Sequence, residues 1–220
     1  MAFDAIIFDM DGVLVDSEVY WHRARVDFAA ERGKTWTDAD QRAAMGRGTL
    51  EWAAVMKERL RLDEPLTAVV DEMLARMMAL YTQRLPLRPG AVEAVRLAAS
   101  RARCGLASGS PTQLIQHVTR LSGLDAVFEE IVYGDDIPNG KPAPDIYVEA
   151  LRRFGARPEH SLGVEDSANG IRALKAAGML IVAAPSPGFP LAPEVAALSD
   201  VQISTLEDFT ADLLDRLTPA

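Results

Sequence analysis

Residues 5–12 read AIIFDMDG: four apolar residues, two aspartates that flank a methionine, and a glycine. An apolar run such as AIIF is typical of a strand that is buried on both faces of a parallel sheet. Similar runs recur along the chain, and helical patterns that open at proline or serine separate them. The apolar runs are residues 104–107, 130–133, 161–164 and 179–183, and the helical patterns are residues 89–101, 111–121, 144–154 and 167–177. This alternation predicts an α/β fold with a Rossmann-like parallel sheet.

The stretch from residue 17 to residue 85 interrupts this alternation. It holds helical patterns and no strand-like run, and the patterns are residues 17–32, 38–44, 49–60 and 65–84. We therefore predict an all-helical domain of residues 17–85, inserted into a core of residues 1–16 and 86–220. An insertion after the first strand leaves the sheet at its carboxyl edge, where open α/β sheets bind ligands. We expect the helical domain to act as a cap over that edge.

Composition narrows the range of partners. The chain has 220 residues, with 23 Lys and Arg against 32 Asp and Glu, for a net charge of −9. This balance argues against binding to nucleic acid or to an acidic membrane surface, because both need a basic face. The single cysteine, Cys104, forms neither an internal disulfide nor a cysteine zinc site. The first residues lack the basic region of a secretory signal, and we expect a cytoplasmic protein.

Two acidic pairs follow predicted strands. Asp9 and Asp11 come directly after the run at residues 5–8, and Glu165 and Asp166 come after the run at residues 161–164. Buried carboxylates that lie together need a cation or a proton to offset their charge. A hard divalent cation such as Mg²⁺ takes oxygen ligands of this kind. The first pair is also compatible with a solvated turn, and the second with simple capping of the next helix.

Two further segments suit an anion. Ser108 and Gly109 follow a predicted strand and open a helix, where a hydroxyl and free backbone N–H groups can bind a phosphate. Lys141 lies in the stretch GKPAPD at residues 140–145, whose prolines restrict the loop around it. The lysine could neutralise a phosphoryl group beside a metal. A solvated surface charge is the alternative for Lys141.

The order of these four segments resembles the four motifs of the haloacid dehalogenase-like hydrolase superfamily. The stretch DMDGVLVDSE at residues 9–18 resembles the branch of β-phosphoglucomutases and sugar phosphatases that carry a helical cap. The resemblance implies that Asp9 is the nucleophile that takes the phosphoryl group. It implies that Asp11 protonates the leaving oxygen and then activates water.

The same resemblance implies the binding groups. Mg²⁺ would be held by Asp9, the main-chain carbonyl of Asp11 and Asp166, with Glu165 as a direct ligand or behind one. Ser108, Gly109 and Lys141 would bind the phosphoryl oxygens. These roles suit phosphoryl transfer, where catalysis consists mainly of positioning and charge neutralisation.

The predicted cap departs from the mutase pattern. Trp21 stands where the mutases carry a histidine, and Met45 where they carry a lysine. These departures favour a phosphatase, and Gly46 and Arg47 are the candidate substrate-binding residues of the cap.

We therefore expect a Mg²⁺-dependent phosphatase that hydrolyses a small phosphorylated metabolite, a phosphosugar by preference, through an aspartyl-phosphate. The alternatives are a β-phosphoglucomutase-type isomerase and a non-catalytic phosphometabolite-binding protein. We expect a monomer or a small homo-oligomer.

Overall fold

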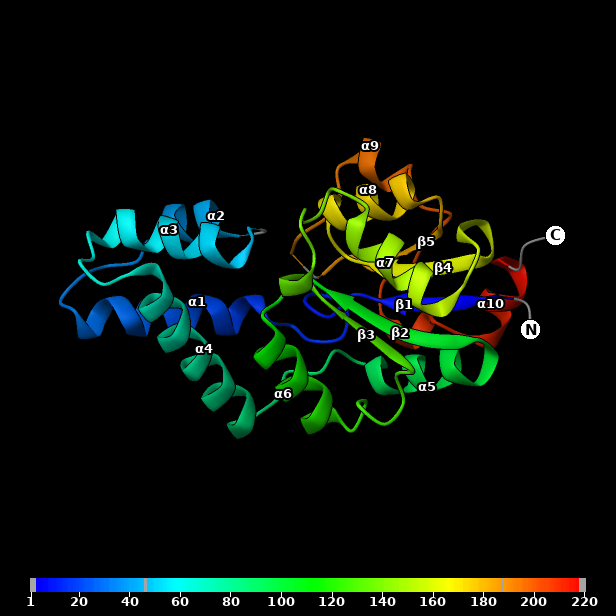
Figure 1. Cartoon of the computed structure of the whole chain (residues 1–220), viewed down its shortest axis with the longest axis horizontal. Coiled ribbons are helices and arrows are strands. Elements are labelled where there is room, and N and C mark those ends of the chain that lie inside the picture. The colour runs from blue at the N-terminus through cyan, green and yellow to red at the C-terminus, as the bar shows by residue number, and fades with distance from the viewer. Residues whose placement is uncertain (1–2, 46, 187, 218–220) are drawn as a thin grey trace. The chain divides into compact units, whose positions relative to one another are not determined.

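The core of the structure is a six-stranded parallel sheet. The computed structural model describes residues 3–45, 47–186 and 188–217. The strand order is β3-β2-β1-β4-β5-β6, with β1 near the centre (Figure 1). The strands are β1 (Ala5–Phe8), β2 (Arg103–Ser108), β3 (Glu130–Tyr133), β4 (Ser161–Glu165), β5 (Leu180–Ala183) and β6 (Val201–Gln202). The order runs outward from β1 in both directions, so a switch of strand order lies beside β1.

Helices cover both faces of this sheet. In Figure 1, α7 and α8 lie on one face and α5 lies on the other. The helices of this part are α5 (Ala91–Arg101), α6 (Thr112–Ser122), α7 (Asp145–Phe154), α8 (Ala168–Ala177), α9 (Pro193–Ala196) and α10 (Ala211–Leu217). Short 3-10 turns are η1 (Gly134–Asp136), η2 (Pro158–His160) and η3 (Leu206–Asp208).

The residues of β1 show why this strand is uniformly apolar. Ala5 and Ile7 pack in the cluster formed with α7 and α8, while the ring of Phe8 lies 5.6 Å from that of Phe209. Successive side chains of a strand point to opposite faces, and all four residues of β1 are buried. Both faces of the central strand are therefore covered, as the apolar run predicts.

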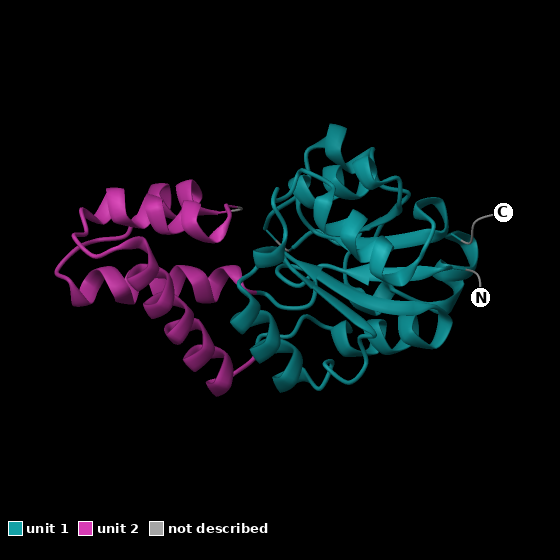
Figure 2. Cartoon of the chain, in the orientation of Figure 1, with its two compact units in different colours: residues 1–16, 86–220 teal, residues 17–85 magenta. Residues whose placement is uncertain are grey.

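The chain divides into two compact units, residues 1–16 with 86–220 and residues 17–85 (Figure 2). The second unit consists of helices in its described residues: α1 (Glu18–Glu31), α2 (Asp38–Ala44), α3 (Thr49–Leu60) and α4 (Leu66–Gln83). The predicted fold class, a Rossmann-like parallel sheet with an inserted all-helical unit, is confirmed. The segments that leave and re-enter the sheet unit run side by side: the N–H of Asp16 donates to the Pro86 carbonyl (2.9 Å), and that of Arg88 to the Leu14 carbonyl (2.9 Å).

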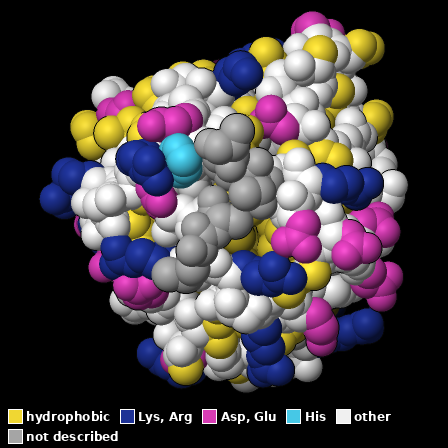
Figure 3. Space-filling view, turned by 90° about the vertical axis from the view of Figure 1, so that its right-hand side faces the viewer, with side chains coloured by type: hydrophobic (Ala, Val, Ile, Leu, Met, Phe, Trp, Pro, Cys, Tyr) yellow, Lys and Arg dark blue, Asp and Glu magenta, His cyan; other side chains and the backbone are white. Residues whose placement is uncertain are grey.

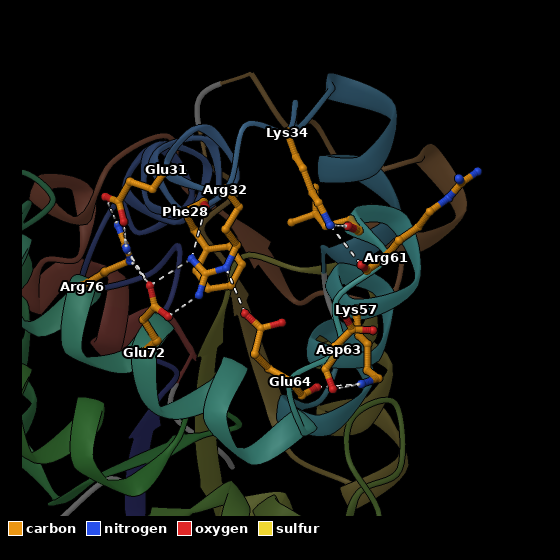
Figure 4. Close-up of polar contacts among 11 residues, drawn as sticks. Phe28, Glu31, Arg32, Lys34, Lys57, Arg61, Asp63, Glu64, Glu72 and Arg76 are labelled. Atoms are coloured by element: carbon orange, nitrogen blue, oxygen red, sulfur yellow. Dashed lines mark hydrogen bonds and ion pairs between the residues drawn. The ribbon is translucent and has the colours of Figure 1, made fainter.

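An ion-pair network ties α1 to α4 inside the helical unit (Figure 4). The Arg32 guanidinium lies 3.6 Å from the centroid of the Phe28 ring and donates to Glu72 at 2.6 Å. Arg76 bonds Glu72 (2.6 Å) and also Glu31. Two arginines share Glu72, and Arg32 also lies over the Phe28 ring. This network should therefore stabilise the packing of α1 on α4 more than an isolated surface ion pair would. Figure 4 also shows Lys34 and Lys57, which donate to carbonyls at the end of α3 and in the loop after it.

Acidic and basic side chains are interspersed on the face of the molecule shown in Figure 3. In the sheet unit, Asp4 pairs with Arg157 (2.8 Å) and Arg101 with Asp215 (3.1 Å). Among the described residues, no helix has the length and apolarity needed to cross a membrane.

Candidate active site

The register of the sheet brings three predicted residues to neighbouring strand ends. Phe8 of β1 pairs with Leu106 of β2 on one side and with Val164 of β4 on the other. Asp9 follows β1 directly, and its N–H donates to the Val164 carbonyl at 3.0 Å. Ser108 ends β2 and Glu165 ends β4. All three residues therefore lie at the carboxyl edge of the sheet, two of them on the strands that flank β1.

Lys141 joins two of the carboxylates at this edge. Its Nζ donates to Asp9 Oδ1 at 2.7 Å and to Glu165 Oε1 at 2.5 Å, and its side chain is 15% exposed. Burial acts to lower the pKa of Lys141, but the charges of Asp9 and Glu165 outweigh it and hold the pKa well above its usual value. The amine is therefore a cation, shared by a carboxylate from each of two adjacent strands.

Glu165 is fully buried and engaged on both oxygens. Besides Lys141, the Tyr147 hydroxyl donates to Oε1 at 2.9 Å. The N–H groups of Asp166 and Ser167 donate to Oε2 at 3.0 and 3.1 Å, and the Ser167 hydroxyl does so at 3.1 Å. These contacts anchor Glu165 to the turn that opens α8, where Ser167 also caps the helix by accepting from the N–H of Gly170. Capping of the helix that follows the second acidic pair and a place for Glu165 in the acidic cluster therefore occur together.

The acidic groups form one cluster. Oxygen atoms of Asp9, Glu165 and Asp166 lie within 4.8 Å of one another. Burial, followed by the charge of Glu165, raises the pKa of Asp166 to about 7. Burial also raises the pKa of Asp9 well above its usual value, although Lys141 opposes this. A divalent cation relieves such a concentration of negative charge, and carboxylate oxygens are the ligands of hard cations. The cluster could hold a divalent metal.

Asp11 lies at the same edge and points one oxygen at a neighbouring loop. Its Oδ2 accepts from the Ser110 hydroxyl at 2.6 Å. Its Oδ1 is buried and has no hydrogen-bond partner among the described residues. Buried acceptors are nearly always paired in folded proteins, so an orphaned oxygen indicates a position where a ligand or water binds.

The remaining predicted residues fall in two places. Ser108 is buried, and its hydroxyl accepts from the N–H of Ser110 at 3.1 Å, in the loop that also holds Gly109. Arg47 is exposed in the helical unit, where its Nε donates to the Ala43 carbonyl at 2.6 Å. Gly46 lies outside the described residues.

Three polar side chains at the sheet edge have no place in the sequence motifs: Arg88, Tyr147 and Ser186. Arg88 donates to the Gly12 carbonyl, and the Ser186 hydroxyl lies within hydrogen-bond distance of that carbonyl and of Asp166. Of these three, only Tyr147 has a sequence signal that could have identified it: it is a hydroxyl-bearing residue on the apolar face of the helical pattern that follows Lys141.

Comparison with known proteins agrees with this geometry. The family model for haloacid dehalogenase-like hydrolases matches residues 3–178. The chain belongs to this family. Hexitol phosphatase B of Escherichia coli is 33% identical over 217 residues, covering 96% of this chain and 96% of that protein. A phosphorylated carbohydrates phosphatase of Thermotoga maritima is 33% identical over 177 residues, covering 80% and 82%.

A solved structure extends the comparison to the fold. CbbY from Rhodobacter sphaeroides, in complex with phosphate, superposes with a TM-score of 0.84 at 26% identity, over 97% of this chain and 99% of that one. The expected resemblance to the branch with a helical cap is confirmed, and so is the expected enzyme class, a haloacid dehalogenase-like phosphatase.

Proposed function

We propose that this protein is a Mg²⁺-dependent phosphatase that hydrolyses a small phosphorylated sugar or polyol by way of a phosphoryl group on Asp9. The observation that carries the proposal is the bridge from Lys141 to Asp9 and Glu165. It gives the buried Asp9 carboxylate a cationic partner that opposes the rise of its pKa, at the carboxyl edge of the sheet and beside the phosphate-binding loop expected at Ser108 and Gly109. The names of the two phosphatase relatives, which refer to hexitols and phosphorylated carbohydrates, support the substrate class.

The acidic cluster suits the metal. Mg²⁺ would be held by carboxylate oxygens of Asp9 and Asp166 and by the main-chain carbonyl of Asp11, and it would neutralise charge on the phosphoryl oxygens. Glu165 has a different part in this proposal, because five donors already occupy its oxygens. It holds Lys141 and the turn that carries Asp166.

The chemistry of the first half-reaction follows from the two aspartates. A carboxylate oxygen of Asp9 attacks phosphorus, while Lys141, the Ser108 hydroxyl and the N–H of Gly109 bind the phosphoryl oxygens. The bond from phosphorus to the sugar oxygen breaks, and Asp11 gives that oxygen a proton. The buried Oδ1 of Asp11, which has no partner among the described residues, is the oxygen available for this transfer.

The second half-reaction restores the enzyme. Asp11, now ionised, takes a proton from a water molecule, whose oxygen attacks phosphorus. The bond from phosphorus to Asp9 breaks and inorganic phosphate leaves. Protons balance, because Asp11 gives one in the first step and takes one in the second.

The helical unit has the role of a cap in this proposal, over a catalytic core of residues 1–16 and 86–220. Gly46 and Arg47 would contact the sugar, with Arg47 reaching a hydroxyl or a second anionic group. Such a lid excludes bulk water while the phosphoryl group is transferred.

The test is phosphate release from a panel of sugar phosphates, polyol phosphates, nucleotides and phosphoglycolate, with Mg²⁺ and with EDTA. We expect metal-dependent release from a few sugar or polyol phosphates. Asp9→Asn should lower kcat by about 1,000-fold or more, because it removes the nucleophile. Asp4→Asn is the matched control, since Asp4 lies at the other end of β1. Full turnover by Asp9→Asn would contradict the proposal. Conversion of β-glucose 1-phosphate to glucose 6-phosphate without phosphate release would favour the isomerase.

A further inference from the structure

Arg88 is an almost fully buried arginine whose bonds go to the backbone around the active site. It is 7% exposed, and it precedes Pro89 and Gly90 at the start of the segment that leads into α5. Its Nη1 donates to the carbonyls of Gly12 and, at 2.9 Å, Ala184, and its Nη2 donates to that of Pro185 at 3.3 Å. One guanidinium therefore joins the turn after Asp11 to the segment that follows β5.

Ser186 repeats the connection from the other side. Its hydroxyl lies 3.0 Å from the Gly12 carbonyl and 3.1 Å from Asp166 Oδ2. A hydroxyl has one proton, so it donates to one of these acceptors at a time. Either way, the segment after β5 is held against both the Gly12 peptide and the Asp166 carboxylate.

Gly12 and Asp166 are themselves in direct contact. Gly12 has a φ of +78°, and a Cβ at this position would lie 1.9 Å from Asp166 Oδ2. The absence of a side chain lets the turn approach the carboxylate closely. The Gly12 carbonyl, which Arg88 and Ser186 hold, is one peptide away from the main-chain carbonyl of Asp11.

The charge of Arg88 is directed at the same place. Burial lowers its pKa, and attraction to Asp166 and Asp16 opposes that lowering. All three of the acceptors described above are main-chain carbonyls. The guanidinium thus keeps its positive charge while it bonds neutral groups, and this charge acts on Asp166 through space.

We propose that Arg88 and Ser186 are positioning residues that set the separation between the Asp11–Gly12 peptide and the Asp166 carboxylate, and through it the affinity of the site for its divalent metal. This inference rests on the proposed function, which places Mg²⁺ between these groups. Groups that orient metal ligands without touching the metal change metal affinity by about 10- to 100-fold when they are removed. Arg88→Met, which keeps the apolar length of the side chain, should fall in that range. Arg88→Lys keeps the charge but not the fork that spans two segments, and it should recover part of the affinity. Ser186→Ala should weaken binding by a smaller factor.

The test is a titration with Mn²⁺, followed by electron paramagnetic resonance, which counts free ions without any need for turnover. Wild type should bind one ion at a site that Asp166→Asn abolishes. Arg88→Met should weaken this binding about 10-fold or more, and the Mg²⁺ concentration for half-maximal phosphatase activity should rise by the same factor. At saturating Mg²⁺ the kcat of the Arg88 and Ser186 variants should stay within about threefold of wild type. Arg103→Lys is the matched control. Arg103 also donates to a carbonyl, that of Phe154, but it lies at the start of β2, at the end of the strand away from the site.

The outcomes separate the two claims. If wild type shows no Mn²⁺ binding that depends on Asp166, the proposed function fails. If wild type binds and the Arg88 and Ser186 variants bind equally well, only the inference fails. A variant with a lower unfolding midpoint and lower kcat but unchanged Mn²⁺ affinity also overturns it, since that pattern belongs to a purely structural residue. If Arg88→Met does not fold, Arg88→Lys and Ser186→Ala decide the question by the same titration.

Discussion

Replacement of Gly170 by alanine should disable the site through Glu165 and not through the helix. Gly170 lies in the first turn of α8, and a Cβ built there would sit 1.7 Å from Glu165 Oε1 and 1.9 Å from its Cδ. Five donors hold Glu165, so the collision cannot be relieved by a free rotation. The carboxylate must move, and Lys141 must move or lose a partner with it.

The effect on stability and the effect on activity should differ in size. Alanine is favoured over glycine in a helix by about 1 kcal/mol, while overpacking of a buried position costs about 1–3 kcal/mol. The net loss of unfolding free energy should therefore be small, about 0–2 kcal/mol. A shift of about 1 Å in a positioned catalytic group lowers the rate by about 100-fold. We expect kcat to fall by about that factor while the protein remains folded.

The assay is kcat on the best substrate of the panel, with the unfolding free energy from urea denaturation. Asn169→Ala is the control, because this exposed neighbour changes the same helical turn without adding atoms. A second background sharpens the test: Glu165→Asp shortens the side chain, so adding Gly170→Ala to it should cost much less than in wild type. If Gly170→Ala keeps kcat within threefold of wild type, or if its effect is the same in both backgrounds, displacement of Glu165 does not control the rate.

Three further predictions concern stability. Lys141→Ala leaves two buried carboxylates without their shared cation, so the unfolding free energy at pH 7 should fall by about 3–5 kcal/mol in urea denaturation. The control, Lys175→Ala on the exposed side of α8, should change the unfolding free energy by less than about 0.5 kcal/mol. The hydrogen bonds from Arg157 lower the pKa of Asp4 from 3.8 to about 2. The ion pair therefore stabilises the folded state fully above pH 3.8, and its contribution is lost as the pH falls toward 2. Wild type and Asp4→Asn should differ by up to about 1 kcal/mol at pH 5 and converge near pH 2, and a difference independent of pH would contradict the ion pair. Mg²⁺ at about 100 times its dissociation constant should raise the unfolding free energy of wild type by about 2.7 kcal/mol, and thermal denaturation of Asp166→Asn should show almost none of this gain.

Much of the fold follows from patterns of four or five residues. The predicted runs at residues 5–8, 130–133 and 161–164 match β1, β3 and β4 to within one residue. β1 and β4 are buried throughout and leave a continuous apolar signal, whereas β3 is an edge strand in which only Val132 is buried. β2 extends one residue beyond the predicted run at each end, to Arg103 and Ser108. β6 has two residues, which is too short for any periodicity, and it forms only because β5 offers it a paired edge.

Some features of the candidate site could likewise be predicted from the sequence, and others could not. The sequence identified Asp9, Lys141 and Glu165 because each follows or precedes a strong local pattern. The fold then brings them together, although Lys141 and Asp9 are 132 residues apart in the sequence. The sequence could not predict that hydrogen-bond donors occupy both oxygens of Glu165, because these donors come from the Lys141 loop, from α7 and from the turn before α8. Arg88 was equally hidden, since its acceptors are backbone carbonyls that no sequence pattern marks.

Trapping the phosphoryl group on Asp9 is the decisive experiment for the proposed nucleophile. p-Nitrophenyl phosphate has a leaving group that needs no proton, so Asp11→Asn should still be phosphorylated by it but should lose the water activation of the second step. With Mg²⁺, this variant should release a burst of one p-nitrophenolate per molecule. Quenching followed by borohydride, which reduces an acyl phosphate to an alcohol, should then convert residue 9 to homoserine, as read by mass spectrometry of the peptide. Absence of the burst, or a label at a residue other than Asp9, would contradict the role of Asp9 as nucleophile.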